Sequence, residues 1–157
     1  MKSFTTALLA CLCLLGSGQA AAEASLQIRD AWIREAPPAA KVLAAYMELH
    51  NNGTTPAIVR AIHSPDFGRI EIHRTVVEQG VARMLPVELL QIPPAGKVVL
   101  EPGGMHLMLF TPVRPLRQDD KVSMTIELAN GACRQFEATV IRRTGDDGQQ
   151  HHHQHNH

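Results

Sequence analysis

Histidine and methionine side chains recur on the less apolar faces of short alternating segments of this chain. In "MHLMLF", period-two alternation places the leucines on one face and His106 and Met108 on the other. The same alternation places His73 opposite the isoleucines of "GRIEIHRT", and Met84 opposite the valines and leucine of "VARMLPVE". Imidazole and thioether groups bind small, soft metal ions, so these residues are candidate ligands. Ordinary half-buried side chains are the alternative, since periodicity does not show that the segments meet in space.

Short strands must position these side chains, because nearly every segment alternates with a period of two and ends at turn residues. The pattern predicts eight or nine strands, over residues 25–34, 41–51, 56–64, 68–78, 81–88, 96–102, 105–110, 121–129 and 131–143. Turns are expected at residues 79–80, 102–104 and 130–131. No segment has helical periodicity long enough for a major helix. The predicted fold class is all-β, an antiparallel Greek-key sandwich or barrel.

The composition fits one compact domain, since the 157 residues are 45% hydrophobic and 19% charged. The formal net charge is zero and no basic patch stands out. Neither nucleic acid nor an anionic membrane surface is therefore an expected partner. The sequence contains no nucleophile with a matching base and no paired carboxylates in a plausible pocket, so we do not expect an enzyme.

Residues 1–22 have the features of a secretory signal peptide, because Lys2 precedes an apolar stretch too short to span a bilayer comfortably. Small residues follow, and we expect cleavage near Ala22. The tetrapeptide "LLAC" ending at Cys11 resembles a lipoprotein signal, but it falls early and the apolar run continues past it. We expect a soluble protein in the periplasm, with no membrane insertion after signal removal.

Cys133 is the single cysteine left once the signal is removed. One thiol closes no internal disulfide and builds no thiolate metal site alone. A blue-copper site needs a cysteine followed shortly by a histidine and a methionine, and the segment "RQFEATVIRR" after Cys133 contains neither. The H-E-x-x-H spacing of zinc hydrolases is absent as well. We expect no role for Cys133 in metal binding.

The four candidate ligands follow the spacing H-x10-M-x21-H-x-M. This spacing resembles the motif of the periplasmic copper chaperones (PCuAC-like), a family with a cupredoxin-like fold that serves the CuA centre of cytochrome oxidase. The segments "DAWIREAPP", "AAYMELHNNG", "IPPAGKVVLEPGGMHLMLF" and "PLRQDDKVSMTIEL" are similar to that family's segments in the same order, over residues 26–141. The resemblance implies a cupredoxin-like β-sandwich that binds one Cu(I) through His73, Met84, His106 and Met108. It also implies delivery of copper to an oxidase assembly pathway.

Neutral thioether and imidazole donors suit Cu(I) better than zinc, which more often requires thiolates or a carboxylate. Thioethers also survive an oxidising compartment better than thiolates do. Such a site is expected to hold copper firmly and to release it to a thiolate-rich acceptor. Both histidines must be deprotonated to bind, so the affinity is expected to fall below about pH 6–6.5.

Several ionisable residues near these segments are expected to stay outside the site. His50 and His63 lie outside the spacing and are interpreted as surface or loop residues. Glu71 and Arg74 flank His73, and we expect them to be solvated charges rather than partners that orient it.

Residues 144–157 are a polar tail that is predicted to be disordered, which leaves residues 23–143 as the folded domain. Clustered imidazoles bind Cu(II), so the tail is a candidate second metal site. Its five histidines are His151, His152, His153, His155 and His157. A purification tag is the alternative interpretation, but Gln154 and Asn156 interrupt the run.

The function expected from the resemblance is that of a periplasmic copper chaperone. Its expected partner is a copper-accepting oxidase subunit or another periplasmic copper-handling assembly protein, and we expect a monomer. Two alternatives stay open. One is a periplasmic copper buffer without a dedicated client, and the other is a metal-free β-sandwich interaction module. Stabilisation of the fold by added Cu(I) would separate the last from the first two.

Overall fold

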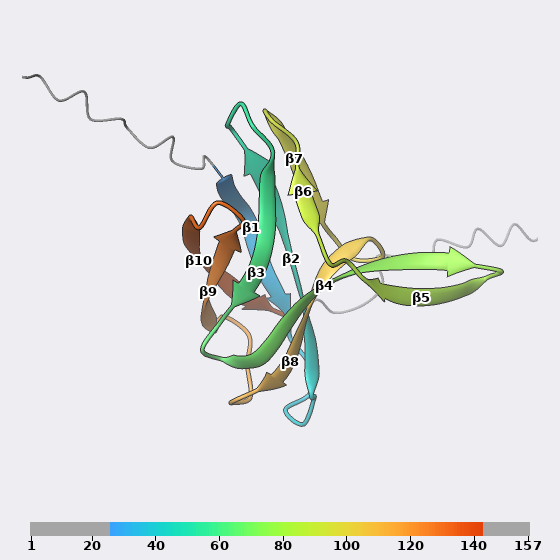
Figure 1. Cartoon of the computed structure of the whole chain (residues 1–157). Helices are drawn as coiled ribbons and strands as arrows, with labels where there is room; N and C mark the ends of the chain where they lie inside the picture. The colour runs from blue at the N-terminus through green and yellow to red at the C-terminus, as the bar shows by residue number, and fades with distance from the viewer. Residues whose placement is uncertain (1–25, 143–157) are drawn as a thin grey trace, which may run out of the picture.

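The structure is a computed structural model that describes residues 26–142, and every regular element in that range is a β-strand (Figure 1). The strands are β1 (Leu26–Arg34), β2 (Val42–Asn51), β3 (Ala57–His63), β4 (Phe67–Glu78), β5 (Val81–Pro86), β6 (Leu90–Ile92), β7 (Gly96–Leu100), β8 (Met105–Pro112), β9 (Lys121–Leu128) and β10 (Cys133–Ile141). The all-β prediction is confirmed. The predicted signal peptide and histidine tail lie outside the described residues.

The strands form one curved sheet in the order β5-β4-β8-β2-β1-β10-β9-β3-β6, with β7 paired to β2 in line with β8. All neighbours are antiparallel except β1 and β10, which run parallel. A parallel pair needs a long crossover connection, and the rest of the domain supplies it here. Alternation of side chains shows which face of a strand is buried, but it does not show the direction of the neighbouring strand. The sequence pattern therefore does not predict the parallel pair of β1 and β10.

Strand β6 is the element that the sequence pattern missed. It has three residues, pairs with β3 and is followed by two prolines. A strand this short contains too few residues to display alternation. Each of the other nine strands lies within a predicted segment or extends at most two residues beyond it.

The interior of the domain is filled by alternate residues of the long strands. Leu107 and Leu109 of β8 have no solvent exposure, as the alternation predicted. In β2, the residues that share their face are Leu43, Ala45, Met47 and Leu49. Burial of such side chains contributes about 1.5–3 kcal/mol each relative to exposure, so the inward faces are strongly specified. The other faces of β8 and β2 are therefore fixed on the outside of the sheet.

Strands β7 and β8 are two parts of one course along β2, separated by a turn at residues 101–104. The Gly104 amide donates to the Glu101 carbonyl at 3.0 Å, and the Glu101 amide donates to the Met105 carbonyl at 2.7 Å. Gly103 has a φ of +80°, which favours glycine. The chain leaves β2 at this turn and then pairs with β2 again, in the same direction, through the strand that contains His106.

Strands β4 and β5 form a hairpin around Gln79 and Gly80, whose φ angles are +52° and +78°. Two consecutive residues with positive φ match the two-residue turn that fits the twist of a hairpin. The hairpin projects from the body of the domain (Figure 1), and all six residues of β5 are exposed.

Candidate metal centre

His73 and His106 lie directly opposite each other in the paired strands β4 and β8. Their side chains share one face of the sheet, and the ring centroids are 6.3 Å apart. A metal ion bound to one nitrogen of each ring would lie about 2 Å from that nitrogen and about 3 Å from each ring centre. The observed separation therefore leaves room for one ion between the two rings.

The two methionines stand on the same face as the histidines. Met108 is two residues from His106 along β8 and lies opposite Glu71. Met84 lies opposite Thr75, which is two residues from His73 along β4. Directly opposed residues in antiparallel strands have Cβ atoms about 4.5–5.5 Å apart, and diagonal neighbours about 7–8 Å apart. The register thus places all four residues of the predicted set on one face of β8, β4 and β5, and this face is called the patch below. The two histidines lie directly opposite each other, and the methionines lie at the two ends of the patch, level with residues four apart along β4.

The four side chains differ in their exposure to solvent. His106 is buried at 5% exposure, and the His73 side chain is 12% exposed. Met108 is half-buried, whereas Met84 is 58% exposed. The candidate site is therefore closed on the side of β8 and open on the side of β5.

A backbone carbonyl holds the ring of His106. Nδ1 of His106 lies 3.2 Å from the Gly104 carbonyl oxygen, which also accepts a hydrogen bond from the Thr75 amide at 3.1 Å. Because a carbonyl only accepts, Nδ1 carries the proton and donates. The lone pair of Nε2 is then available to a metal ion. The turn before β8 thus sets the tautomer of His106.

A carboxylate holds the ring of His73. Nε2 of His73 donates to Glu71 at 2.8 Å, and the other Glu71 oxygen lies 3.1 Å from Nε of Arg69. The expectation that Glu71 is merely a solvated charge is therefore wrong. The two residues stand two positions apart in one strand and share a face, which is a signal the sequence did contain.

Nδ1 of His73 is buried and has no hydrogen-bond partner among the described residues. An unpaired buried polar atom costs about 1–3 kcal/mol, and such atoms in folded proteins generally have a specific role. Since Nε2 carries the proton, Nδ1 holds an unshared lone pair. An imidazole nitrogen with an unshared lone pair can donate to a soft metal ion such as Cu(I).

Two aromatic rings extend the row of imidazoles across the sheet. The centroid of Tyr46 is 6.5 Å from that of His106, and the centroid of Trp32 is 4.4 Å from that of Tyr46. Arg34 lies over the Tyr46 ring at 6.0 Å. Sequence reasoning missed this row, because it depends on β1, β2, β8 and β4 being neighbours. The rings cover the β2 side of His106.

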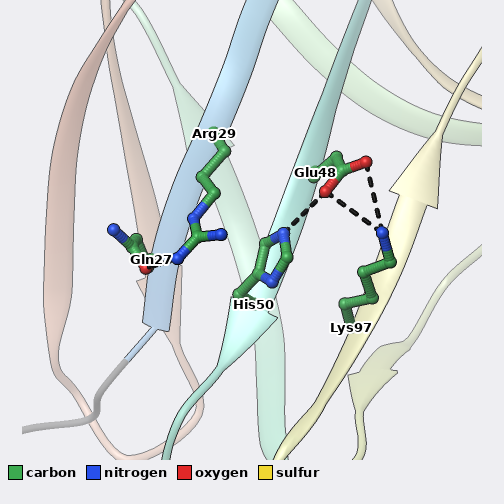
Figure 2. A network of polar contacts seen from close by, with 5 residues as sticks. All are labelled: Gln27, Arg29, Glu48, His50 and Lys97. Atoms are coloured by element: carbon green, nitrogen blue, oxygen red, sulfur yellow. Dashed lines mark hydrogen bonds and ion pairs between the residues drawn. The ribbon is translucent and has the colours of Figure 1, made fainter.

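His50 belongs to a polar network on the outer face of β2, two residues beyond Glu48 (Figure 2). Its Nε2 lies 2.7 Å from Glu48, and Nζ of Lys97 lies 3.3 Å from both oxygens of the same carboxylate. The hydrogen bond from His50, followed by that from Lys97, lowers the pKa of Glu48. The interpretation of His50 as a surface or loop residue agrees with the structure in its first alternative, because His50 lies on the outer face of a strand. It remains outside the metal patch.

Other candidate residues also lie away from the patch. His63 ends β3, where its Nε2 is 3.7 Å from Glu127. Cys133 begins β10 and is exposed. Between residues 26 and 142, no group of three or more His, Cys, Asp and Glu residues is placed to hold a metal ion.

A cavity of about 270 Å³ opens beside the patch, between β3 and β4. Glu71 and Pro86 line it on one side, and Val59 and Ile62 line it on the other. The cavity leaves the carboxylate that holds His73 partly accessible to solvent.

Within the described range, no helix is long and apolar enough to cross a membrane.

Residues 26–140 match the LpqE-like family, whose description is that of a lipoprotein. A protein of Leifsonia xyli subsp. xyli, Lxx21020, also named as a lipoprotein, is 30% identical over 108 residues, or 68% of this chain. The chain spans only 64% of that relative's own length.

Solved structures share the fold. The copper-bound PCuAC domain from PmoF2 has a TM-score of 0.65 at 19% identity, over 76% of this chain and 94% of that domain. The Cu(I)-bound form of DR1885 from Deinococcus radiodurans has a TM-score of 0.60 at 29% identity, over 79% of this chain and 84% of that protein. These comparisons support a cupredoxin-like sandwich of the PCuAC type for this chain.

Proposed function

Because this chain belongs to the LpqE-like family and has the fold of the PCuAC domains, we propose that it is a periplasmic copper chaperone. The proposed site binds one Cu(I) through His73, Met84, His106 and Met108. The observation that carries the proposal is the buried, unpartnered Nδ1 of His73, in a ring that faces His106.

The two imidazoles supply a pre-set pair of donors in this proposal. Glu71 holds His73 and the Gly104 carbonyl holds His106, so little reorganisation is needed when the ion arrives. Met108 would join from the same strand as His106, and Met84 would have to move toward the histidines from the exposed hairpin to complete the site. Thioether and imidazole donors are neutral, so the bound ion keeps its single positive charge and stays exchangeable.

The destination of the copper is the second part of the proposal. We expect transfer to a thiolate-bearing acceptor, such as the oxidase subunit that houses the CuA centre. Thiolates bind Cu(I) more strongly than thioethers, which gives the transfer its direction. The alternative of a copper buffer predicts copper sensitivity without loss of oxidase activity when the gene is deleted.

The proposed organisation is a signal peptide over residues 1–22, a copper-binding domain over residues 23–143 and a tail over residues 144–157. The lipoprotein names of the family and of its relative support export to the cell envelope. The mass of the mature protein would distinguish cleavage after Ala22 from processing at Cys11. The tail histidines are proposed as a separate Cu(II) site.

An anaerobic Cu(I) competition titration tests the site. The mature protein should bind one tight equivalent, and Met108→Ala should weaken it while leaving the fold intact. A truncation after Arg143 should retain the tight equivalent. Absence of tight Cu(I) binding by the parent protein would reject the proposal and favour a metal-free interaction module.

A further inference from the structure

Exposed apolar side chains gather on the β4–β5 hairpin. Six large hydrophobic residues are exposed in the described part of the chain, and four of them belong to this hairpin. The four are Val77, Val81, Met84 and Leu85, which are between 47% and 70% exposed. The other two, Leu89 and Val113, lie outside it. Apolar surface concentrated on one projecting element is typical of a protein interaction site.

The hairpin presents apolar groups on both faces and has an unpaired edge. Val77 shares the ligand face with Met84, and Val81 shares the opposite face with Leu85. In residues 26–142, β5 pairs with β4 alone, so its outer backbone edge has no partner strand. Natural sheets usually protect such an edge with charge or with a covering element. Arg83 is the one charged residue of β5, and it lies 4.0 Å from Glu78 of β4.

The same element carries the most accessible of the proposed copper ligands. Met84 is exposed, whereas His106 at the far side of the site is buried. A partner that covers the hairpin would therefore meet Met84 before any other ligand. Arg83 and Glu78 offset each other, and Arg74, opposite Leu85, leaves this end of the hairpin with a single excess positive charge. An apolar contact surface therefore suits the hairpin better than a strongly charged one.

We propose that the β4–β5 hairpin is the docking surface for a Cu(I) acceptor whose receiving cysteine is flanked by apolar side chains. This inference rests on the proposed function. Docking would place the cysteine sulfur beside Met84. A bond then forms between Cu(I) and the thiolate sulfur, and the bond between Cu(I) and the Met84 thioether breaks. Copper stays in the +1 state, and a cysteine that arrives protonated gives its proton to solvent water.

Two capped tripeptides, Leu-Cys-Leu and Ser-Cys-Ser, are the probes. The rate at which each removes Cu(I) from the copper-loaded mature protein is measured anaerobically. The apolar peptide should act about five- to tenfold faster, as expected when one or two aliphatic side chains are partly buried on docking. An extended peptide paired along the free edge of β5 would place its cysteine on the face of Met84 and the two neighbours of the cysteine on the face of Val81 and Leu85. The double variant Val81→Ser/Leu85→Ser should therefore bring the ratio of the two rates close to one. These positions are exposed, so the variant should keep its fold and its Cu(I) affinity.

The matched control is the double variant Leu89→Ser/Val113→Ser, which removes one leucine and one valine outside the hairpin that are slightly more exposed. It should keep the full rate ratio of the parent protein. A ratio near one in the parent, or a ratio unchanged by the hairpin variant, would overturn the docking surface. Failure of the parent to bind Cu(I) is detected before the probes are added, and it would reject the proposed function itself.

Discussion

Glu71 and His73 face the same side of β4 and form a hydrogen bond of 2.8 Å, which leaves the opposite nitrogen of the imidazole buried and unpartnered. The carboxylate is in turn fixed by Arg69. This short chain of contacts sets the tautomer of one proposed ligand by the chemistry of its neighbour. It also orients the His73 ring by contacts within the chain itself.

Loss of Glu71 should therefore weaken copper binding without loss of the fold. Glu71→Ala should lower Cu(I) affinity by about 10–100-fold, the usual effect of removing a partner that orients a metal-binding histidine. Glu71→Gln should lose less, because its amide oxygen still accepts from Nε2. The control is Glu78→Ala, on the same strand but exposed at the hairpin end. Competition titration measures all three, and equal affinities for the Glu71 and Glu78 variants would contradict the role of Glu71.

Replacement of His106 should lower the Cu(I) affinity more than replacement of a histidine outside the patch. His106→Ala removes a buried donor, so the Cu(I) affinity should fall by more than about 100-fold, the upper range for loss of an orienting partner. His63→Ala should leave the affinity unchanged, because His63 lies at the end of β3 beside Glu127. If both variants bound copper like the parent protein, His106 would not be a ligand.

Backbone strain in the turn before β8 should lower both the stability of the fold and the Cu(I) affinity of the proposed site. Gly103→Ala places a Cβ on a residue with a φ of +80°, which should lower the free energy of unfolding by about 1 kcal/mol. It should also weaken Cu(I) binding, because the adjacent Gly104 carbonyl holds His106. Gly131→Ala is the control, since its φ is +84° and it lies in the β9–β10 turn. A Cβ at either glycine meets nothing within 4 Å, so both variants should be destabilised alike, but only the first should bind copper less tightly.

The ion pair of Glu35 with Arg142 should make stability depend on acid pH. The hydrogen bond from Arg142 lowers the pKa of Glu35 below its ordinary value of 4.5. A carboxyl whose pKa is lower in the folded state stabilises the fold above its unfolded pKa. That contribution is lost as the pH falls through the folded pKa. Arg142→Gln should therefore reduce the midpoint of urea unfolding more at pH 7 than at pH 3. An equal reduction at both pH values would contradict this assignment.

Deletion of residues 148–157 should separate the two proposed metal sites. Cu(I) affinity should stay that of the parent protein, because the core ligands all lie between residues 73 and 108. The number of Cu(II) equivalents bound should fall, since five histidines are removed. Equilibrium dialysis with each ion provides the measurement. Unchanged Cu(II) stoichiometry would reject the tail as a metal site.

Alternation along single strands predicted much of this arrangement. Leu107 and Leu109 point inward and His106 and Met108 do not, because an apolar interior fixes one face of β8. The neighbours of a strand were not predictable in the same way. The row from Trp32 through Tyr46 to His106 depends on pairing between distant segments, which a periodic pattern does not encode. The partnership of Glu71 with His73 was within reach, because both residues occupy one face of one strand.

Strands β8 and β5 differ in how many of their edges are hydrogen-bonded, and this difference should separate their opening to solvent. Strand β8 is hydrogen-bonded on both sides, whereas β5 is hydrogen-bonded on one. Amide hydrogens in β8 should exchange only when the whole domain opens, and those in β5 should exchange through separate, local openings. Local opening of the hairpin would thus move Met84 away from the proposed site while the core stays folded. If the proposed function holds, copper would be loaded and released through this local opening, without global unfolding of the domain.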